Sequence, residues 1–286
     1  MSARSVARII PAARTVEGGG FVVYRAFPTP ALDHVDPFLL IDELGPVDYR
    51  PGEAVGAPAH PHRGFEAVTY VLAGALVHRD SAGHSGSLDS GDLQWMTAGA
   101  GLVHAEMPSD AVMRDGGRMH GIQLWVNLPR VAKMLPPSYQ QVRAAEIPEA
   151  GAAGLSVKVV AGRHAGVSGP INTQSPILYL HVRLEPGATF EHLLPATHNA
   201  LAYVIEGSAF MGVSRLPASR RQMPLFAHDG DRVGLVSGDQ GAELLVLAGA
   251  PLDEPIARYG PFVMNTREEV ARAVEDYRAG RMGELS

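Results

Sequence analysis

The chain has 286 residues, of which 46% are hydrophobic and 19% charged, enough to bury the cores of two ordinary domains. Its net charge of -6 comes without a basic stripe, which argues against direct nucleic-acid binding. It contains no cysteine, which excludes a disulfide scaffold, a thiolate metal site and a cysteine nucleophile.

The N-terminal segment carries Arg4, Arg8 and Arg14 before its first acidic residue, Glu17. We interpret it as a first strand with a solvated basic face rather than as an organellar presequence, because Pro11 interrupts it. No apolar run is long enough for a signal peptide or a membrane span. We therefore expect a cytoplasmic protein that does not bind a membrane.

Short apolar segments rich in β-branched residues follow along the chain, each of strand length and each ended by a turn signal. They include residues 68–72, 122–126, 177–182 and 244–247. The 32 glycines and 22 prolines fit many turns between such strands. Regular spacing of short strands is typical of sandwiches and barrels, so we predict an all-β protein.

Two segments carry helical signals. Residues 129–134 have the pattern of a single turn, and two prolines soon follow them. The second signal is stronger, because Thr266 and Glu269 form a capping box and Gly280 stands where a helix would end. The apolar residues between them fall on one helical face: Val270, Ala273, Val274 and Tyr277. We predict a C-terminal amphipathic helix that lies on a barrel.

A faint internal repeat indicates that the barrel occurs twice. Residues 70–74, Tyr-Val-Leu-Ala-Gly, are echoed by residues 203–207, Tyr-Val-Ile-Glu-Gly. The Gly-Asp pair at 91–92 is likewise echoed by the pair at 230–231. Because both echoes occur in the same order, we interpret them as a duplication.

The first chemical feature is the pair His60 and His62. Residues i and i+2 of a strand project to the same face, so both imidazoles can reach one ion. The proline between them suits the start or the edge of a strand. By itself such a pair is weak evidence, since two ordinary surface histidines would look the same.

The second feature is His104 followed two residues later by Glu106, again on one strand face. Together with the first pair it makes a set of three nitrogens and one oxygen, close to the facial arrangement of non-haem Fe(II) oxygenases. Such a set leaves one or two coordination positions open, as a catalytic or sensing metal requires. We predict one divalent transition metal, Fe(II) first, although Mn, Co, Ni, Cu or Zn could occupy the same ligands.

These motifs resemble those of the pirins, a family of bicupins. The resemblance runs from about residue 5 to 280, and its N-terminal motifs are long. The matching segments are residues 37–43, 60–66, 91–99, 104–107, 123–129 and 260–266. It implies two fused cupin β-barrels, with an iron ion on the residues that match the pirin ligands: His60, His62, His104 and Glu106.

We expect an N-terminal metal-binding cupin barrel over residues 1–130 and a C-terminal cupin barrel over residues 131–286, which ends in the helix. The second barrel is expected to bind no metal. In register with the repeat, its four matching positions carry no ligand pair: Leu193, Pro195, Glu243 and Leu245.

The resemblance also implies an activity, because pirin-like bicupins can act as quercetin 2,3-dioxygenases. Such enzymes open the ring of a flavonol with O2 and release carbon monoxide. The metal would act as Lewis acid and template for the flavonol oxygens. Glu106 would be the catalytic base that accepts the proton of the flavonol hydroxyl.

The competing hypothesis is an iron-dependent redox sensor that regulates a protein partner, either a transcription factor or a metabolic enzyme. Because the chain has no basic patch, a transcriptional role would act through that partner rather than through DNA. A third and weaker alternative is an isomerase or another cupin activity on an oxygenated small molecule. We expect a monomer in each case.

The remaining histidines and tryptophans have ordinary interpretations. His78 and His84 are assigned no role in the site, and the surroundings of His84 indicate a loop. His120 precedes a strand, where a hydrogen bond in the core or a turn is favoured over a place in the cavity. Trp95 and Trp125 are interpreted as core residues.

Overall fold

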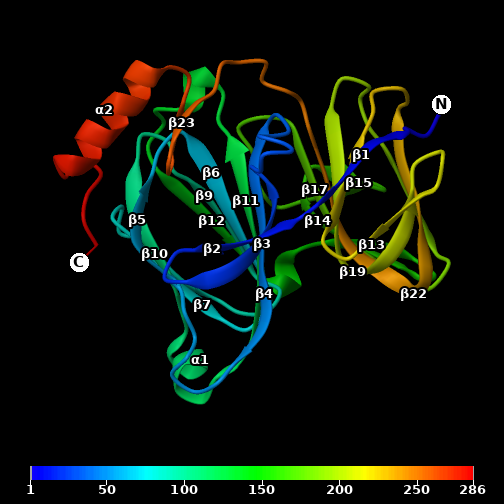
Figure 1. Ribbon diagram of the computed structural model, residues 1–286, viewed down its shortest axis with the longest axis horizontal. Helices are drawn as coiled ribbons and strands as arrows, with labels where there is room; N and C mark the ends of the chain where they lie inside the picture. Colours follow the sequence, from blue (N-terminus) through cyan, green and yellow to red (C-terminus); the bar gives the residue numbers. More distant parts are fainter. Residues whose placement is uncertain (1, 286) are drawn as a thin grey trace. The chain divides into compact units, whose positions relative to one another are not determined.

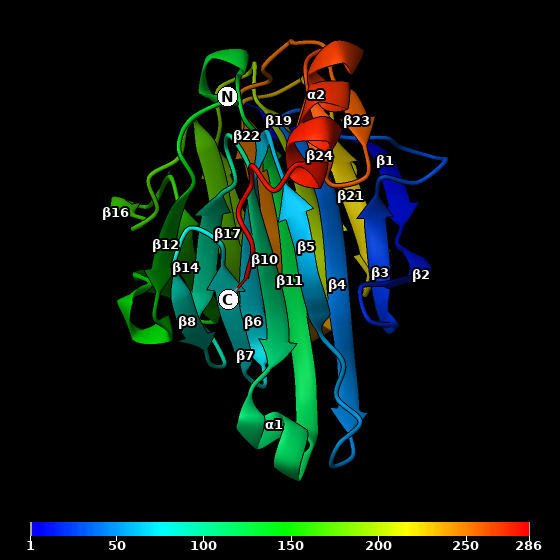
Figure 2. The same ribbon diagram turned by 90° about the vertical axis from the view of Figure 1, so that its left-hand side faces the viewer.

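The computed structural model describes residues 2–285, and it is 57% strand and 8% helical. Its strands and helices are drawn in Figures 1 and 2. The prediction of an all-β protein with a C-terminal helix is confirmed. Among the described residues, none of the helices has both the length and the apolar character needed to cross a membrane.

The chain divides into two compact units, which we call the first and the second barrel unit. The first unit consists of residues Arg14–Phe27, Phe38–Ala144 and Leu252–Ser286. The second unit consists of residues Met1–Ala13, Pro28–Pro37 and Ala145–Pro251. The units therefore differ from the contiguous ranges 1–130 and 131–286 at both ends of the chain. The physical reason is strand pairing, since the N-terminal strand joins the second unit's sheet through Ile10 opposite Met223.

The first barrel unit contains a seven-stranded sheet in the order β12-β9-β6-β11-β4-β3-β2 and a four-stranded sheet in the order β5-β10-β7-β8. The strands of the larger sheet are β2 (Ala13–Glu17), β3 (Phe21–Phe27), β4 (Phe38–Tyr49), β6 (Phe65–Ala73), β9 (Leu93–Thr97), β11 (Gly117–Asn127) and β12 (Ser138–Val142). Those of the smaller sheet are β5 (Ala57–His62), β7 (Leu76–Asp80), β8 (Ser85–Leu88) and β10 (Leu102–Pro108). A hydrogen bond between Thr69 of β6 and Glu106 of β10 shows that the two sheets face each other.

The second barrel unit repeats this arrangement in the order β1-β21-β19-β22-β17-β14-β13, with β18 paired to β22 and β20 to β19. Its long strands are β1 (Val6–Pro11), β14 (Leu155–Ala161), β17 (Ile177–Leu184), β19 (Asn199–Met211) and β22 (Arg232–Gly249). The shorter strands are β13 (Glu149–Ala152), β18 (Thr189–Leu193), β20 (Leu216–Ser219) and β21 (Gln222–Phe226). A separate two-stranded ribbon consists of β15 (Arg163–His164) and β16 (Val167–Ser168).

The helical elements are short, apart from one. They are α1 (Asp110–Asp115), η1 (Arg130–Ala132), η2 (Ala144–Glu146) and α2 (Arg267–Arg278). The predicted single turn at 129–134 is the 3-10 turn η1. At the start of α2 the predicted capping box is confirmed, because Thr266 accepts from the Glu269 amide and the Glu269 carboxylate accepts from the Thr266 amide.

The C-terminal segment packs on the first barrel unit. Helix α2 contacts the hairpin of β23 (Ala257–Tyr259) and β24 (Phe262–Met264), as Figure 2 shows. Lys133, only 2% exposed, donates from its Nζ atom to the carbonyls of Gly64 and Val263. Its third acceptor is the Asn127 amide oxygen at 2.7 Å. This buried ammonium therefore ties the hairpin to the loop that follows β5.

The two sheet orders allow the predicted repeat to be tested. Strands β6 and β19 occupy the same place in the two orders, and Tyr70 and Tyr203 are both buried, so the first echo is confirmed. The second echo is wrong. The Gly-Asp pair at 91–92 precedes β9, whereas the pair at 230–231 precedes β22, whose first half corresponds to β10.

The register that we derived from the Gly-Asp echo is therefore corrected. Glu243, which that echo matched to His104, lies in the second half of β22, opposite Arg183 of β17. Leu193, which the Tyr-Val echo matched to His60, is 58% exposed. The positions that face the interior of this barrel are apolar instead, and they belong to a large buried cluster: Phe190, Leu194, Val233 and Leu235.

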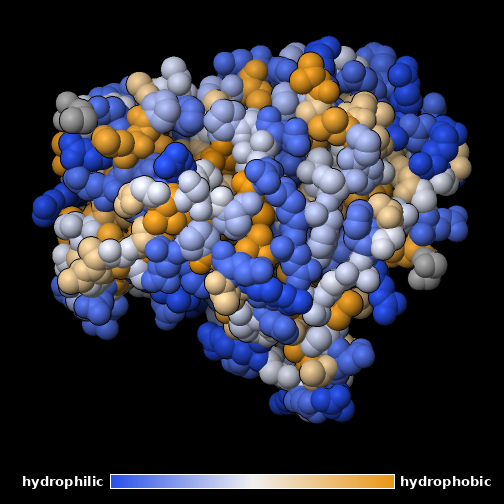
Figure 3. Space-filling model, turned by 180° about the vertical axis from the view of Figure 1, so that it is seen from behind, coloured by the Kyte–Doolittle hydropathy of each residue, from blue (hydrophilic) through white to orange (hydrophobic). Residues whose placement is uncertain are grey.

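On the surface, by contrast, the face in Figure 3 is mainly hydrophilic, with hydrophobic residues in scattered small patches.

Candidate metal centre

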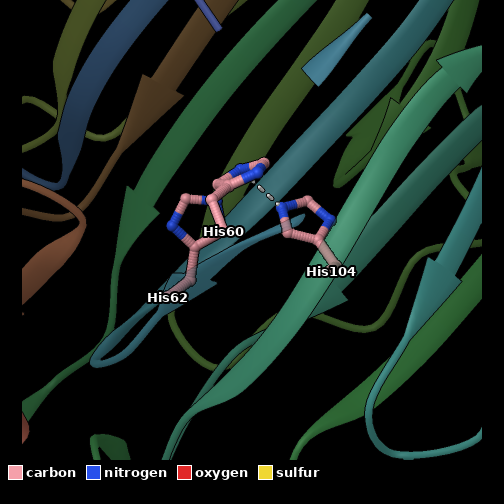
Figure 4. Close-up of side chains that lie close together, drawn as sticks. All are labelled: His60, His62 and His104. Atoms are coloured by element: carbon pink, nitrogen blue, oxygen red, sulfur yellow. Dashed lines mark hydrogen bonds between the residues drawn. The ribbon is translucent and has the colours of Figure 1, made fainter. Parts of the chain in front are cut away.

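Three histidines converge inside the first barrel unit. His60 and His62 extend from β5, and His104 lies on the neighbouring strand β10, where it is the register partner of His60. The Nε2 atom of His60 lies 3.1 Å from that of His62 and 3.0 Å from that of His104. Figure 4 shows the three rings pointing toward one another. The period-two argument from the sequence therefore places all three correctly.

The three rings form a compact donor set. One ring nitrogen from each residue lies within 4.8 Å of the other two, and no other group of three or more histidines and carboxylates comes together in this way in residues 2–285. His62 and His104 are only 3% and 1% exposed. Three imidazole nitrogens directed at one point would repel each other's lone pairs unless a proton or a cation lay between them.

The surroundings hold two of these imidazoles in the neutral form. Burial lowers the pKa of His62 well below its usual value, and the adjacent His60 lowers it further. Burial likewise lowers the pKa of His104 well below its usual value, with further lowering by His62, His60 and His78. A neutral imidazole has a free lone pair, the form in which histidine binds a metal.

Glu106 lies beside this group rather than within it. It is on β10, two residues after His104, but the register against β5 shifts between the two residues. Its Oε1 atom accepts a hydrogen bond from Thr69 Oγ1 at 2.5 Å, and the Gln123 side chain contacts the same hydroxyl at 3.1 Å. The structure thus brings the three predicted histidines together and holds the predicted carboxylate at the edge of the cluster.

Aromatic side chains line the same region. Phe65 and Trp125 stack with a centroid distance of 4.2 Å, and both present their rings to His62, at 5.0 and 5.2 Å. Trp125 is half-buried and packs against the core cluster that contains Phe65, in keeping with its interpretation as a core residue, and its ring also forms part of the wall of the centre. Trp95 is fully buried, as predicted.

The other histidines of this unit have defined partners. His120 lies 3.0 Å from a carboxylate oxygen of Glu43, which confirms the predicted hydrogen bond. His84 lies in a loop, as predicted, although β8 already begins at the next residue, and the His84 ring contacts Asp80. His78 is fully buried behind His104, an association that the sequence interpretation missed. The available signal was the period-two pair of His78 and Asp80 on β7.

The residues present fit a divalent transition metal. Three imidazoles from two adjacent strands are typical metal ligands, and a carboxylate lies on the same strand as one of them. The chain has no thiolate that could compete for the ion. The donor set therefore suits a metal with preference for nitrogen and oxygen ligands.

Comparison with known proteins identifies the family. Models of two families match the chain, pirin over residues 20–126 and the pirin C-terminal cupin domain over residues 179–283. The chain belongs to the pirin family. This pirin is 41% identical over 268 residues to a putative quercetin 2,3-dioxygenase from Pseudomonas aeruginosa, a match that covers 92% of this chain and 93% of that protein. The predicted bicupin architecture is confirmed.

Solved structures give the same result. A crystal structure of quercetin 2,3-dioxygenase from Acinetobacter baumannii matches this pirin with a TM-score of 0.93 and 35% identity, covering all of both chains. A bacterial pirin from Escherichia coli in complex with nickel(II) matches with a TM-score of 0.66 over 85% of this chain and 99% of that chain. At 20% identity, this second likeness shows the fold alone.

Proposed function

We propose that this pirin holds one divalent transition metal, Fe(II) first, on His60, His62, His104 and Glu106. The observation that carries the proposal is the convergence of three Nε2 atoms in a buried site. The nickel(II) complex of the Escherichia coli relative supports a metal in this fold. Mn, Co, Ni, Cu and Zn suit the same ligands, and affinity rises toward copper, so metal content after overexpression is weak evidence for the native metal.

We further propose that the protein is a dioxygenase that cleaves a flavonol such as quercetin. Both atoms of O2 enter the organic product and one ring carbon leaves as carbon monoxide, so the substrate itself supplies the electrons. The metal, when bound, supplies a Lewis acid and template for the flavonol oxygens. The names of the Pseudomonas and Acinetobacter relatives support this substrate class.

The residues around the centre have distinct tasks in this proposal. Glu106 accepts the proton of the flavonol hydroxyl, since a carboxylate is a base of suitable strength when it lies within hydrogen-bond reach of the substrate. The Thr69 hydroxyl, 2.5 Å from Glu106 Oε1, fixes the orientation of that carboxylate. The stacked pair of Phe65 and Trp125 offers a flat apolar wall to an aromatic substrate.

The test begins with anaerobic purification and reconstitution with Fe(II), followed by measurement of quercetin loss and carbon monoxide release. The wild-type protein is expected to do both, and His104→Ala is expected to lose metal and activity. His34→Ala, which changes a half-buried histidine of the second barrel unit, is the control and retains both. Iron-loaded protein that leaves flavonols intact would overturn the proposed activity while leaving the metal site standing.

Glu106→Gln tests the role of Glu106 as a base while the three histidine ligands stay in place. We expect it to retain most of the metal and to lose turnover by roughly 100-fold or more, the usual contribution of a general base. Full turnover by a metal-loaded Glu106→Gln variant would show that Glu106 is not the base.

A further inference from the structure

Each histidine of the cluster has one ring nitrogen that faces the centre and a second, outer nitrogen that faces away from it. In His60 and His104 this outer nitrogen is Nδ1, and it is held differently in the two residues. His60 presents Nδ1 to the main-chain carbonyl of Pro58 at 2.7 Å. A carbonyl only accepts, so Nδ1 of His60 carries the proton and Nε2 keeps its lone pair for the centre. His104 has no such carbonyl at its outer nitrogen. Its Nδ1 atom lies 3.4 Å from Nδ1 of another imidazole, that of His78.

Two facing imidazole nitrogens form a hydrogen bond only if one carries a proton and the other does not. Metal binding at the centre determines which of the two rings carries that proton. If Nε2 of His104 is to offer a lone pair to a metal, Nδ1 of His104 must be the donor. Nδ1 of His78 is then the acceptor, which leaves the proton of His78 on Nε2. That atom faces Oδ2 of Asp80 at 3.3 Å, and a carboxylate accepts. Each contact from Asp80 through His78 to His104 therefore has one donor and one acceptor when Nε2 of His104 is free to bind a metal.

Asp80 is itself held in place. Its Oδ1 atom accepts from the main-chain amides of Ala82 at 2.9 Å and His84 at 3.0 Å, and the His84 ring lies 3.0 Å from Oδ2. The side chains of His78 and Asp80 are both fully buried. The Tyr139 ring stacks on the His84 ring, with a distance of 5.6 Å between the ring centroids. A carboxylate with this many fixed donors has little freedom to turn away.

Strand pairing explains why these groups meet. His78 and Asp80 are two residues apart on β7 and so project to the same side. Strand β7 pairs with β10, where Asp80 is opposite His104 and His78 is opposite Glu106. The chain of groups therefore runs between two adjacent strands of the smaller sheet, on the side of His104 away from His60 and His62.

We propose that His78 and Asp80 are positioning residues that fix the ring and the tautomer of His104 and so strengthen metal binding at the centre. This inference rests on the metal site proposed above but not on the flavonol activity. Outer-shell partners of metal-bound histidines typically contribute 10–100-fold to metal affinity. For His60 the equivalent partner belongs to the main chain, so His104 is the ligand whose support a side-chain substitution can remove.

The test measures the dissociation constant of Co²⁺ alone by competition with a chromophoric chelator, together with the visible spectrum of the bound Co²⁺. His78→Leu removes the acceptor, and Asp80→Asn places an amide donor against His78. Each is expected to weaken Co²⁺ binding about 10–100-fold. His78→Asn keeps an acceptor oxygen near the position of Nδ1, so it is expected to weaken Co²⁺ binding by less than about 10-fold, below the usual loss for a removed outer-shell partner.

His181→Leu is the matched control, because His181 is also buried and contacts a carboxylate, Glu243 at 2.8 Å, in the second barrel unit. It is expected to leave Co²⁺ affinity unchanged. Unchanged affinity in both His78→Leu and Asp80→Asn would overturn the proposal, as would equal weakening in His181→Leu. If His78→Leu does not fold without metal, as judged by circular dichroism, the comparison of Asp80→Asn with His78→Asn decides. Undiminished Co²⁺ binding by His104→Ala would instead overturn the metal site itself.

Discussion

Arg63 donates from Nη1 to Oδ2 of Asp276 at 2.7 Å, which joins the residue after His62 to the last helix of the chain. The Arg63 side chain is only 6% exposed, and its Nε atom donates to the Ala100 carbonyl at 2.6 Å. The guanidinium is thus fixed between a loop of the barrel and α2. One consequence is that the C-terminal helix supports the strand end that carries His62.

Asp276→Asn is therefore expected to destabilise the first barrel unit by about 2 kcal/mol, the usual contribution of a hydrogen bond to a charged group, because it leaves a largely buried guanidinium without its charged partner. The measurement is chemical denaturation of metal-free protein. Glu275→Gln is the control, since Glu275 is an exposed neighbour on the same helix. A loss no larger than that of the control would show that the ion pair does not anchor α2.

Acid is expected to weaken the second barrel unit through Glu243. The His181 and Arg183 side chains lower the pKa of this carboxyl from 4.5 to about 2, against the opposing effect of burial. A carboxyl whose pKa is depressed in the folded state stabilises the fold above about pH 4.5, and that contribution is lost as the pH falls toward 2. Burial lowers the pKa of His181, so charging of His181 in the unfolded chain adds to the loss below pH 6.5.

The measurement is the free energy of unfolding between pH 7 and pH 2 for wild type and Glu243→Gln. We expect the variant to lose roughly 3 kcal/mol less over the acid range. Asp239→Asn, at an exposed position, serves as control and should follow the wild type. Parallel curves for wild type and Glu243→Gln would show that the carboxylate is not the acid-sensitive group.

Metal binding is expected to stabilise the first barrel unit and not the second. With free metal at about 100 times its dissociation constant, the gain is about 2.7 kcal/mol. Differential scanning calorimetry with Co²⁺ and then with excess EDTA would detect it as a reversible shift of one transition. His104→Ala should abolish the shift, whereas a shift that persists in this variant would place the stabilising metal elsewhere.

Strand geometry predicted each half of the cluster, and the ligand chemistry together with the pirin resemblance predicted that the halves meet. His60 and His62 share a face by their spacing, and the pairing of β5 with β10 then brings His104 opposite His60. Glu106 shares the period but lies beyond a register shift, which no local pattern reveals. The capping box at Thr266 was likewise predictable, since all of its hydrogen bonds lie within four residues.

What the sequence did not reveal depends on contacts between distant segments. Asp80 and His78 acquire their place only when β7 pairs with β10, and Trp125 of β11 meets His62 of β5 only when the two sheets come together. The ends of the chain belong to units other than those nearest in sequence, because β1 completes one sheet and Asp276 binds Arg63. The Gly-Asp echo failed because a short turn motif recurs before strands that are not equivalent.

Gly64 provides a test of how closely the C-terminal hairpin approaches the metal-binding strand. Its φ is +89°, and a Cβ atom there would lie 2.0 Å from the Val263 carbonyl oxygen. An alanine at this position would therefore adopt an unfavourable backbone conformation, and its Cβ atom would collide with the main chain of Val263. The same Val263 carbonyl accepts a hydrogen bond from Lys133. We expect Gly64→Ala to cost roughly 3 kcal/mol or more and to weaken Co²⁺ binding, because the collision displaces the segment next to His62.

Gly83 is the matched control for this substitution. Its φ is +90°, nearly the same, but among the described residues no heavy atom beyond Gly83 and its two chain neighbours lies within 4 Å of the position that a Cβ would occupy. Gly83→Ala therefore measures the backbone cost alone, about 1 kcal/mol. The difference between the two variants in denaturation experiments isolates the contact with Val263. Equal losses would mean that the hairpin yields to the added methyl group, and that it does not constrain the strand end carrying His62.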